Sequence, residues 1–509
     1  MKKIGILILG LALPLVQLWA QGEIEGEQLS CTSIIVGREA SVDGSVITSH
    51  TCDGNYRTWL SVEPAREHPR KAKRQVYKNT MHSTCREDSS EIRLAGSIPE
   101  VKHTYAYLNT AYPCLNEKQL GIGETTWGGP DTLKNPDSMF LIEELERLAL
   151  ERCSSARDAV LLMGSLAEKY GYADSGECLT VADPKEVWFF EIIGCGKGKK
   201  GAVWVAKRLP DDHVGVSANV PRIGELEDDP QNFLCSKNVK KVALEYGLWD
   251  GKSEFKFWKV YKAEYARGKN FRERDWFILN SLAPSLGLSQ DMDELPFSVK
   301  PDKKVELKDI FALLRSNYEG TELDAIKDLK ISDEEISPLA NPWLTGTMRK
   351  TLNYIKPDLI PFQRTVSVAW CSYSTVIQLR SWLPDAVGGV CYLALDNPGQ
   401  SPRIPIFCAN STLPAPYRRC GQKEYDPQVA LWQFRKANKL ATLAWQKTKG
   451  EFMTMVGEQE KAMLEAVAAL PSDADSQRLD SLTEACHNEA VKLWSDMEAR
   501  LWLMFGMGF

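Results

Sequence analysis

The strongest constraint on the fold is one block of helical spacing between two groups of short β-type runs. Phe140, Leu141, Leu145 and Leu148 recur at three- and four-residue intervals within residues 139–170, which is typical of amphipathic helices. Strands, then helices, then strands predict a layered α+β domain. The β-type runs lie at 34–36, 45–48, 58–62, 104–108 and 120–125 before the block, and at 178–182, 187–193, 202–206 and 214–218 after it.

Local signals refine this prediction. Asp43-Gly44 predicts the turn of a hairpin that begins at Cys31. Ser155 and Asp158 predict an N-terminal cap for a helix over 156–170. The remaining expectations are turns at 183–184 and 194–201 within an antiparallel meander, a helix at 307–318, strands at 365–377 and 388–395, and a long helical hairpin over 427–509 broken at Pro471-Ser472.

The first thirty residues have the anatomy of a leader. Two lysines precede an uncharged apolar run that ends at Ala20, as in a secretory signal peptide, and the alternative is an uncleaved anchor helix. The following segment is acidic, contains glycine and lacks an apolar period, so it predicts a flexible spacer. We expect an exported protein, periplasmic or extracellular. Its predicted parts are a signal peptide at 1–20, a propeptide or spacer at 21–30, a catalytic domain at 31–426 and a helical segment at 427–509.

Charge and cysteine usage exclude some classes of function. The formal net charge is -6 and no long run of lysine or arginine occurs, whereas a nucleic-acid partner requires a basic face. Thirteen cysteines are many for a cytosolic protein but plausible for an exported one. Their odd number leaves at least one thiol over even if the others pair.

The candidate chemistry centres on Cys31. None of the six histidines lies in a local signature for a thiol–imidazole pair, and neither zinc-binding spacings nor a phosphate-binding loop occur. Cleavage between Ser30 and Cys31 would supply a different base, the new α-amino group, whose reference pKa is about 7.7 to 8.0. That amine belongs to the same residue as the thiol, so nucleophile and base would arise together.

Six segments carry a resemblance to a known family. In chain order they are Cys31–Ser45, Leu115–Thr125, Ala182–Trp188, Gly215–Gly224, Pro296–Pro301 and Ser316–Thr321. Together they resemble the dipeptidase A family of N-terminal-nucleophile (Ntn) cysteine peptidases, which are relatives of penicillin V acylase and bile salt hydrolase. The resemblance spans roughly residues 31–405, and no single short motif would reproduce this order by chance.

The resemblance implies a four-layer αββα Ntn-hydrolase sandwich of two antiparallel sheets, with autocatalytic processing and Cys31 as the nucleophile. In the wider superfamily an Arg-x-x-Asp motif follows on the next strand, and the matching stretch here is His50-Thr51-Cys52-Asp53. Asp53 is kept, and it would hold or polarise the α-amine. His50 replaces the arginine, which changes how a substrate carboxylate is stabilised and adds a group that titrates near about 6.5.

Two asparagines complete the implied machinery. Asn116 and Asn219 match residues that, in relatives, form an oxyanion hole and orient the N-terminus. An amide N–H aimed at a developing oxyanion is worth about 3 kcal/mol. The candidate substrate-binding residues are His50, Glu117, Arg222 and Arg364.

Each candidate has a structural alternative. Cys31 follows Leu29-Ser30 and faintly resembles a lipid-modified cysteine, although the apolar run ends too early for that processing. Asp53 alone reads as a turn residue before Gly54, Asn116 as a hairpin residue, and His50 as a hydrogen-bonded polar residue.

The sequence therefore predicts an exported cysteine dipeptidase that hydrolyses short peptides through a Cys31 thioester. The first alternative is an acylase of N-acyl amides, such as penicillin V or conjugated bile acids, and the second is a non-catalytic surface lipoprotein. We expect no metal or organic cofactor, no nucleic-acid partner and no stable membrane span in the mature protein. A homo-oligomer remains an option.

Overall fold

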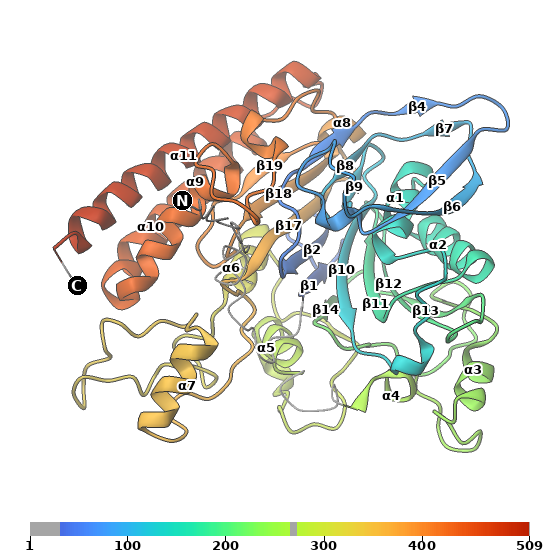
Figure 1. Ribbon diagram of the computed structural model, residues 1–509, viewed down its shortest axis with the longest axis horizontal. Coiled ribbons are helices and arrows are strands. Elements are labelled where there is room, and N and C mark those ends of the chain that lie inside the picture. The colour runs from blue at the N-terminus through green and yellow to red at the C-terminus, as the bar shows by residue number, and fades with distance from the viewer. Residues whose placement is uncertain (1–30, 265–271, 508–509) are drawn as a thin grey trace, which may run out of the picture.

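The computed structural model describes residues 31–264 and 272–507, and two large antiparallel sheets form its centre (Figure 1). The predicted signal peptide and spacer lie outside the described residues. Within them, the first sheet contains, in spatial order, β16 (Ser298–Val299), β14 (Val214–Ser217), β1 (Ser33–Val36), β2 (Val46–Asp53), β17 (Cys371–Leu379), β18 (Gly389–Leu395) and β19 (Ile404–Ile406).

The second sheet is built almost entirely from the chain between β2 and α3. Its described strands are, in spatial order, β15 (Phe233–Cys235), β13 (Ala202–Arg208), β12 (Val187–Gly194), β11 (Gly176–Ala182), β10 (Gly121–Trp127), β9 (Leu115–Asn116), β8 (Tyr107–Asn109) and β3 (Ser61–Glu63). Two small ribbons pair β4 (Arg66–Glu67) with β7 (His103–Thr104) and β5 (Lys73–Lys78) with β6 (Arg93–Pro99).

Helices cover the outer faces of both sheets. Helices α2 and α3 pack on the second sheet, α5 and α6 pack on the first, and α9 to α11 pack beside β18 and β19 (Figure 1). The helix bounds are α1 Ile142–Arg152, α2 Ala156–Tyr170, α3 Val239–Glu245, α4 Phe257–Tyr261, α5 Glu273–Leu282, α6 Leu307–Arg315, α7 Gly346–Ile355, α8 Asp385–Gly388, α9 Ala430–Ala441, α10 Trp445–Ala468 and α11 Ser476–Phe505. The predicted α+β class is confirmed.

The two sheets approach each other closely where β2 crosses β10 and β11. Thr48 Oγ1 and Thr180 Oγ1 are 2.8 Å apart across the interface, and every residue of β2 is buried. A Cβ atom on Gly123 would lie 2.3 Å from the Ser49 carbonyl oxygen. Glycine is therefore required there so that the backbones can meet, and this contact fixes the neighbouring Glu124 against the first sheet.

The best local predictions are confirmed. Helix α2 occupies residues 156–170, and its Ser155 cap accepts a hydrogen bond from the Asp158 N–H. The hairpin that begins beside Cys31 is present as β1 and β2, which pair antiparallel. The strand expected at 388–395 is β18.

Other expectations are wrong in part. The run at 214–218 leaves the meander and joins the first sheet as β14, with Ser217 opposite Ser33. The cause lies in packing, because β15 occupies the free edge of β13 and Val214 and Val216 are buried in a separate apolar cluster. The C-terminal segment contains the predicted pair of helices, α10 and α11, broken around Pro471-Ser472, but α9 precedes them as a third helix. The strand expected from residue 365 starts at Cys371.

The described residues hold two further findings. All thirteen cysteines have free thiols in the structure. No helix in the described part of the chain has the length and apolarity needed to cross a bilayer.

The sheet contact at Gly123 yields a stability prediction. Gly123→Ala should lower the free energy of unfolding by about 1–3 kcal/mol, because the new Cβ clashes with backbone and overpacks the interface. Gly450→Ala, in the middle of α10 with nothing within 4 Å of the added atom, should raise it by about 1 kcal/mol. Urea unfolding of the two variants checks both signs, and equal stability of Gly123→Ala and wild type would contradict the packing argument.

Candidate active site

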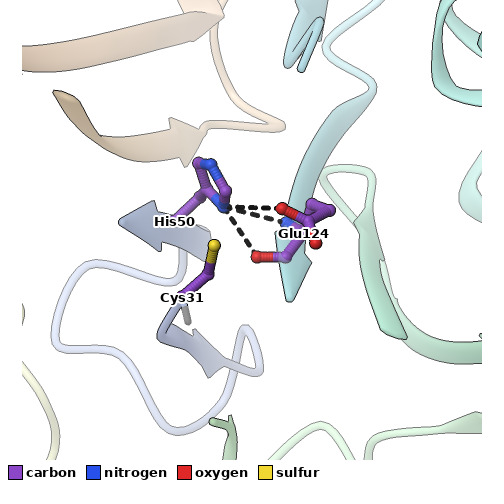
Figure 2. Close-up of side chains that lie close together, drawn as sticks. All are labelled: Cys31, His50 and Glu124. Atoms are coloured by element: carbon purple, nitrogen blue, oxygen red, sulfur yellow. Dashed lines mark hydrogen bonds and ion pairs between the residues drawn. The ribbon is translucent and has the colours of Figure 1, made fainter. Parts of the chain in front are cut away.

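Cys31 lies directly before β1 and is almost fully buried. Its neighbour Thr32 is bridged to Thr51 of β2: the Thr32 N–H donates to Thr51 Oγ1 at 2.9 Å, and the Thr51 N–H donates to the Thr32 carbonyl at 3.0 Å. The Cys31 side chain is 3% exposed. Figure 2 shows its sulfur directed toward the His50 ring and the Glu124 side chain. The start of β1 is therefore held in place, with the thiol aimed between the two sheets.

Arg274 of α5 anchors the backbone around Cys31. One guanidinium nitrogen, Nη1, donates to the Cys31 carbonyl at 2.7 Å and to Thr32 Oγ1 at 2.9 Å. The other, Nη2, donates to the Ala218 carbonyl at 3.1 Å and to Asn219 Oδ1 at 2.7 Å. A planar guanidinium offers donors in a rigid fork, so one side chain fixes the start of β1 relative to the end of β14.

Asp53 is the last residue of β2. Its Oδ2 accepts from Arg364 Nη2 at 2.6 Å and from Thr51 Oγ1 at 3.1 Å. Its Oδ1 is buried and accepts no hydrogen bond among the described residues. The Asp53 backbone N–H also acts on the Cys31 thiol and lowers its pKa, against the larger effect of burial. Asp53 thus presents an unfilled acceptor close to residue 31.

Asn219 follows β14 in a left-handed conformation. Its φ is 64°, which is uncommon outside glycine but well tolerated by asparagine. Its Oδ1 accepts from Arg274, and its Nδ2 donates to the Thr126 carbonyl of β10. The amide therefore bridges the end of β14 in the first sheet to β10 in the second sheet, and it shares Arg274 with the Cys31 carbonyl.

His50 and Glu124 face each other across the sheet interface (Figure 2). His50 Nδ1 lies 2.7 Å from the Glu124 carbonyl oxygen and 3.9 Å from its carboxylate Oε2. Tyr112 and Tyr373 pack on the ring at centroid distances of 5.7 and 5.6 Å. Burial lowers the pKa of His50 to about 4, so the ring is neutral near pH 7. The His50 ring therefore lines the site as an uncharged side chain.

The thiol and the carboxyl are both displaced toward their protonated forms. Burial raises the pKa of Cys31 well above its usual value, and the Glu124 charge adds to this effect. Burial also raises the pKa of Glu124. A thiol in this environment needs a dedicated proton acceptor before it can attack a carbonyl, because the thiolate is the nucleophilic form.

Cys31, His50 and Glu124 also form a group with metal-ligand character. One ligand atom from each lies within 4.8 Å of the others. The histidine nitrogen of this group that faces Glu124 is Nδ1, which already makes the 2.7 Å hydrogen bond. A metal ion there would have to displace that bond, so the donor set suits a thiol site better than a resident ion.

The remaining predicted residues lie elsewhere. Asn116 donates from Nδ2 to the Leu150 and Cys153 carbonyls, both at 2.8 Å, while its Oδ1 accepts from the turn amides of Lys118 and Leu120. Its amide is thus fully engaged in tying a hairpin to the end of α1, which matches the hairpin alternative.

Two further candidate substrate residues contact residues other than those around Cys31. Glu117 is a half-buried residue of the same hairpin as Asn116. Arg222 pairs with Asp275 at 3.4 Å and donates to the Pro296 carbonyl at 2.5 Å, beside a small surface cavity. The structure therefore gathers Cys31, His50, Asp53, Asn219 and Arg364, and leaves Asn116, Glu117 and Arg222 outside this group.

Sequence reasoning missed two buried residues next to Cys31: Arg274 and Glu124. Glu124 lay within a segment that carried the resemblance, where a glutamate flanked by Gly123 in an apolar strand was the available signal. Arg274 lies in a charged stretch that offers no comparable signal, because its partners are between 55 and 243 residues away.

Comparison with known proteins gives this site a family. Residues 30–458 match Peptidase family C69, which covers most of the chain. The chain belongs to peptidase family C69. The expected resemblance is thereby confirmed, and the protein is a peptidase.

Named relatives agree with this assignment. The chain is 26% identical to "Probable dipeptidase" of Latilactobacillus sakei, over 78% of each chain. It is 26% identical to "Probable dipeptidase B" of Lactococcus lactis subsp. lactis (strain IL1403), over 79% of each. It is 24% identical to "Dipeptidase A" of Lactobacillus helveticus, over 76% of this chain and 77% of that protein.

The Arg274 fork generates the first activity prediction for this C69 peptidase. Arg274→Lys keeps the charge but loses the planar set of donors to Cys31 and Asn219, so kcat/KM should fall about 100-fold with the fold retained. Arg272→Lys, two residues earlier in the chain, where the guanidinium donates to the Met292 and Asp293 carbonyls instead, should change kcat/KM less than about twofold. Peptide hydrolysis assays and circular dichroism provide the measurements, and full activity of Arg274→Lys would refute the anchoring role.

The neutral state of His50 generates a pH prediction. The folded pKa of about 4 lies below the unfolded value of about 6.5, so its contribution to stability is present above pH 6.5 and is lost on acidification toward pH 4. In His50→Gln, the stability lost between pH 7.5 and 4.5 should be smaller by about 2 kcal/mol. Urea unfolding at both pH values tests this, and His103→Gln, at an exposed position, is the control.

Proposed function

We propose that this C69 peptidase is an exported cysteine dipeptidase of the N-terminal-nucleophile type. Its nucleophile is Cys31, freed by cleavage after Ser30, and its layers of helices and sheets are those of an Ntn hydrolase. The observation that carries the proposal is the buried thiol at the start of β1, whose carbonyl is gripped by Arg274 beside the open Oδ1 of Asp53. The names of the relatives support dipeptides as the substrates.

The site gives a new α-amine a natural partner. Asp53 acts on residue 31 through both its charge and its backbone N–H, and its Oδ1 lacks a donor among the described residues. An α-amino group on Cys31 would fill that acceptor and hold its lone pair near the thiol. The family match begins at residue 30, which also supports a functional start at Cys31.

The proposed reaction has two halves with balanced proton transfers. The α-amine takes the Sγ proton, the thiolate attacks the peptide carbonyl carbon, and the resulting ammonium then protonates the leaving amine as the C–N bond breaks. Water attacks the thioester while the amine accepts its proton, and the amine returns that proton to Sγ as the C–S bond breaks.

An oxyanion forms in each half of this reaction. The Nδ2 group of Asn219, which donates to the Thr126 carbonyl, is the candidate donor to that oxyanion. Asn116 has no part in this proposal, since its amide is committed to α1.

Export rests on the leader anatomy of residues 1–20. In the proposed sequence of events, a signal peptidase cuts after Ala20, and Cys31 then removes the spacer 21–30 itself. The thirteen free thiols neither require nor oppose this location, because a protein can carry unpaired cysteines in an oxidising compartment.

Replacement of the nucleophile tests the proposal. Wild-type protein should begin at Cys31 and hydrolyse dipeptides, whereas Cys31→Ala should retain Gln21 to Ser30 and lose at least about 1,000-fold in kcat/KM. Cys235→Ala, which removes an exposed thiol, is the matched control and should be processed and active. N-terminal sequencing, intact mass and a dipeptide assay read out both steps. Active protein with peptide still joined ahead of Cys31 would overturn the mechanism.

A further inference from the structure

A second buried carboxyl lies beside Glu124. Glu177 of β11 is opposite Thr126 in the register of β10 and β11, which places it diagonally next to Glu124 on the same face of the sheet. The two side chains are close enough to share a hydrogen bond when one is protonated. Glu124 is fully buried and Glu177 is 2% exposed. Two acids thus meet in the interior, one strand apart.

This pair lacks a countercharge. Thr126 Oγ1 donates to Glu124 Oε1 at 3.1 Å, and the other hydrogen bonds of the two carboxyls come from Thr126, from the Cys31 thiol and from the proton that they share, all of them uncharged donors. Burial raises the pKa of Glu177 well above its usual value, and the nearby charges of Glu124 and Asp174 add to the effect. Among the described groups that most affect these two carboxyls, none is a cation.

The distance between Glu124 and the Cys31 sulfur suits a substrate-binding role for the carboxyl pair. A carboxylate oxygen of Glu124 is within 4.8 Å of Cys31 Sγ. In a peptide, the terminal nitrogen is two bonds from the first carbonyl carbon, about 2.5 Å away. An attacking sulfur approaches that carbon to about 3–3.5 Å. A group that binds the substrate's terminal nitrogen must therefore lie within a few ångströms of Sγ, as Glu124 does.

We propose that Glu124 and Glu177 form the subsite for the protonated α-amino group of the substrate, so that the enzyme selects peptides with a free N-terminus and cleaves after their first residue. The inference rests on Cys31 being the nucleophile, as proposed above. The ammonium group supplies the cation that the pair lacks, and its three N–H donors take the place of the proton that the two carboxyls otherwise share.

The same subsite disfavours the acylase alternative. An N-acyl substrate places an apolar chain or a neutral amide where the ammonium would lie, and the two buried carboxyls then gain no cationic partner. Sites built to pair with a substrate group reject analogues that lack it far more strongly than apolar pockets reject an extra methylene. Selection by Glu124 and Glu177 therefore acts on the charge of the substrate rather than on its size.

A matched pair of substrates tests the subsite. L-Ala-L-Ala and N-propionyl-L-alanine differ only in the terminal amino group, and mature wild-type enzyme should prefer the first by at least about 100-fold in kcat/KM. In Glu177→Gln, kcat/KM for L-Ala-L-Ala should fall at least about tenfold, mainly through KM, while that for N-propionyl-L-alanine changes less than about threefold.

The control variant is Glu143→Gln. Glu143 is a buried glutamate of α1 that accepts from the Asn79 N–H at 3.1 Å, so its loss tests the general cost of removing an interior carboxyl. This variant should leave the preference between the two substrates unchanged. If circular dichroism shows that Glu177→Gln does not fold, the test uses wild-type enzyme and compares inhibition by alaninamide with inhibition by propionamide. We expect alaninamide to bind at least about tenfold more tightly.

Two outcomes would overturn the subsite: equal hydrolysis of the two substrates by wild type, or an equal loss on both in folded Glu177→Gln. Equal inhibition by alaninamide and propionamide would do the same. Each leaves the Cys31 mechanism standing, because hydrolysis would still depend on Cys31. Failure of the proposed function looks different, since Cys31→Ala would then hydrolyse peptides as well as wild type does.

Discussion

The site depends first on the fork of hydrogen bonds from Arg274. This guanidinium is buried, and burial lowers its pKa to about 10, yet it remains charged at neutral pH and reaches the Cys31 and Ala218 carbonyls together with Thr32 and Asn219 side chains. Removing either of the joined strands would leave half of the hydrogen bonds of this buried cation unmade, which is costly. Cys31, the Asn219 amide and the two strand ends are therefore fixed as one unit.

The second constraint is the close contact of the two sheets at Gly123. It brings Glu124 to the thiol and packs the neutral His50 ring against Glu124's backbone. The first sheet thus holds Cys31, and the second holds Glu124 and Glu177, which lie on its inner side. In the proposed mechanism each sheet supplies part of the site, and the glycine contact sets the distance between these parts.

Local signals predicted the elements, and long-range packing decided their partners. The α2 cap and helix were readable because Ser155 and Asp158 act within one turn. The β5–β6 ribbon was missed because its strands, KRQVYK and RLAGSIP, are largely charged or irregular and give no apolar alternation. The destination of β14 was unreadable for another reason, since its alternation fits either sheet equally well.

The same division holds for the site. Cys31, Asp53 and Asn219 were found through their motifs, and the structure gathers them with Arg364. Asn116 and Glu124 lie in one short segment, and both are buried polar residues. Only the contacts that each makes in the folded protein distinguish their roles. Asn116 meets helix carbonyls, whereas Glu124 meets the thiol. Arg274 could not be found locally, because its role exists only after distant strands come together.

The place of β1 in its sheet has a consequence for a chain cut ahead of Cys31. Chain ends ordinarily fray, because terminal residues lack neighbours on one or both sides. Here β14 and β2 flank β1 on both sides in the sheet, so a new N-terminus at Cys31 would be held by both neighbouring strands and would keep its orientation. The liberated amine would then arrive preorganised, with little motional freedom left to lose when a substrate enters.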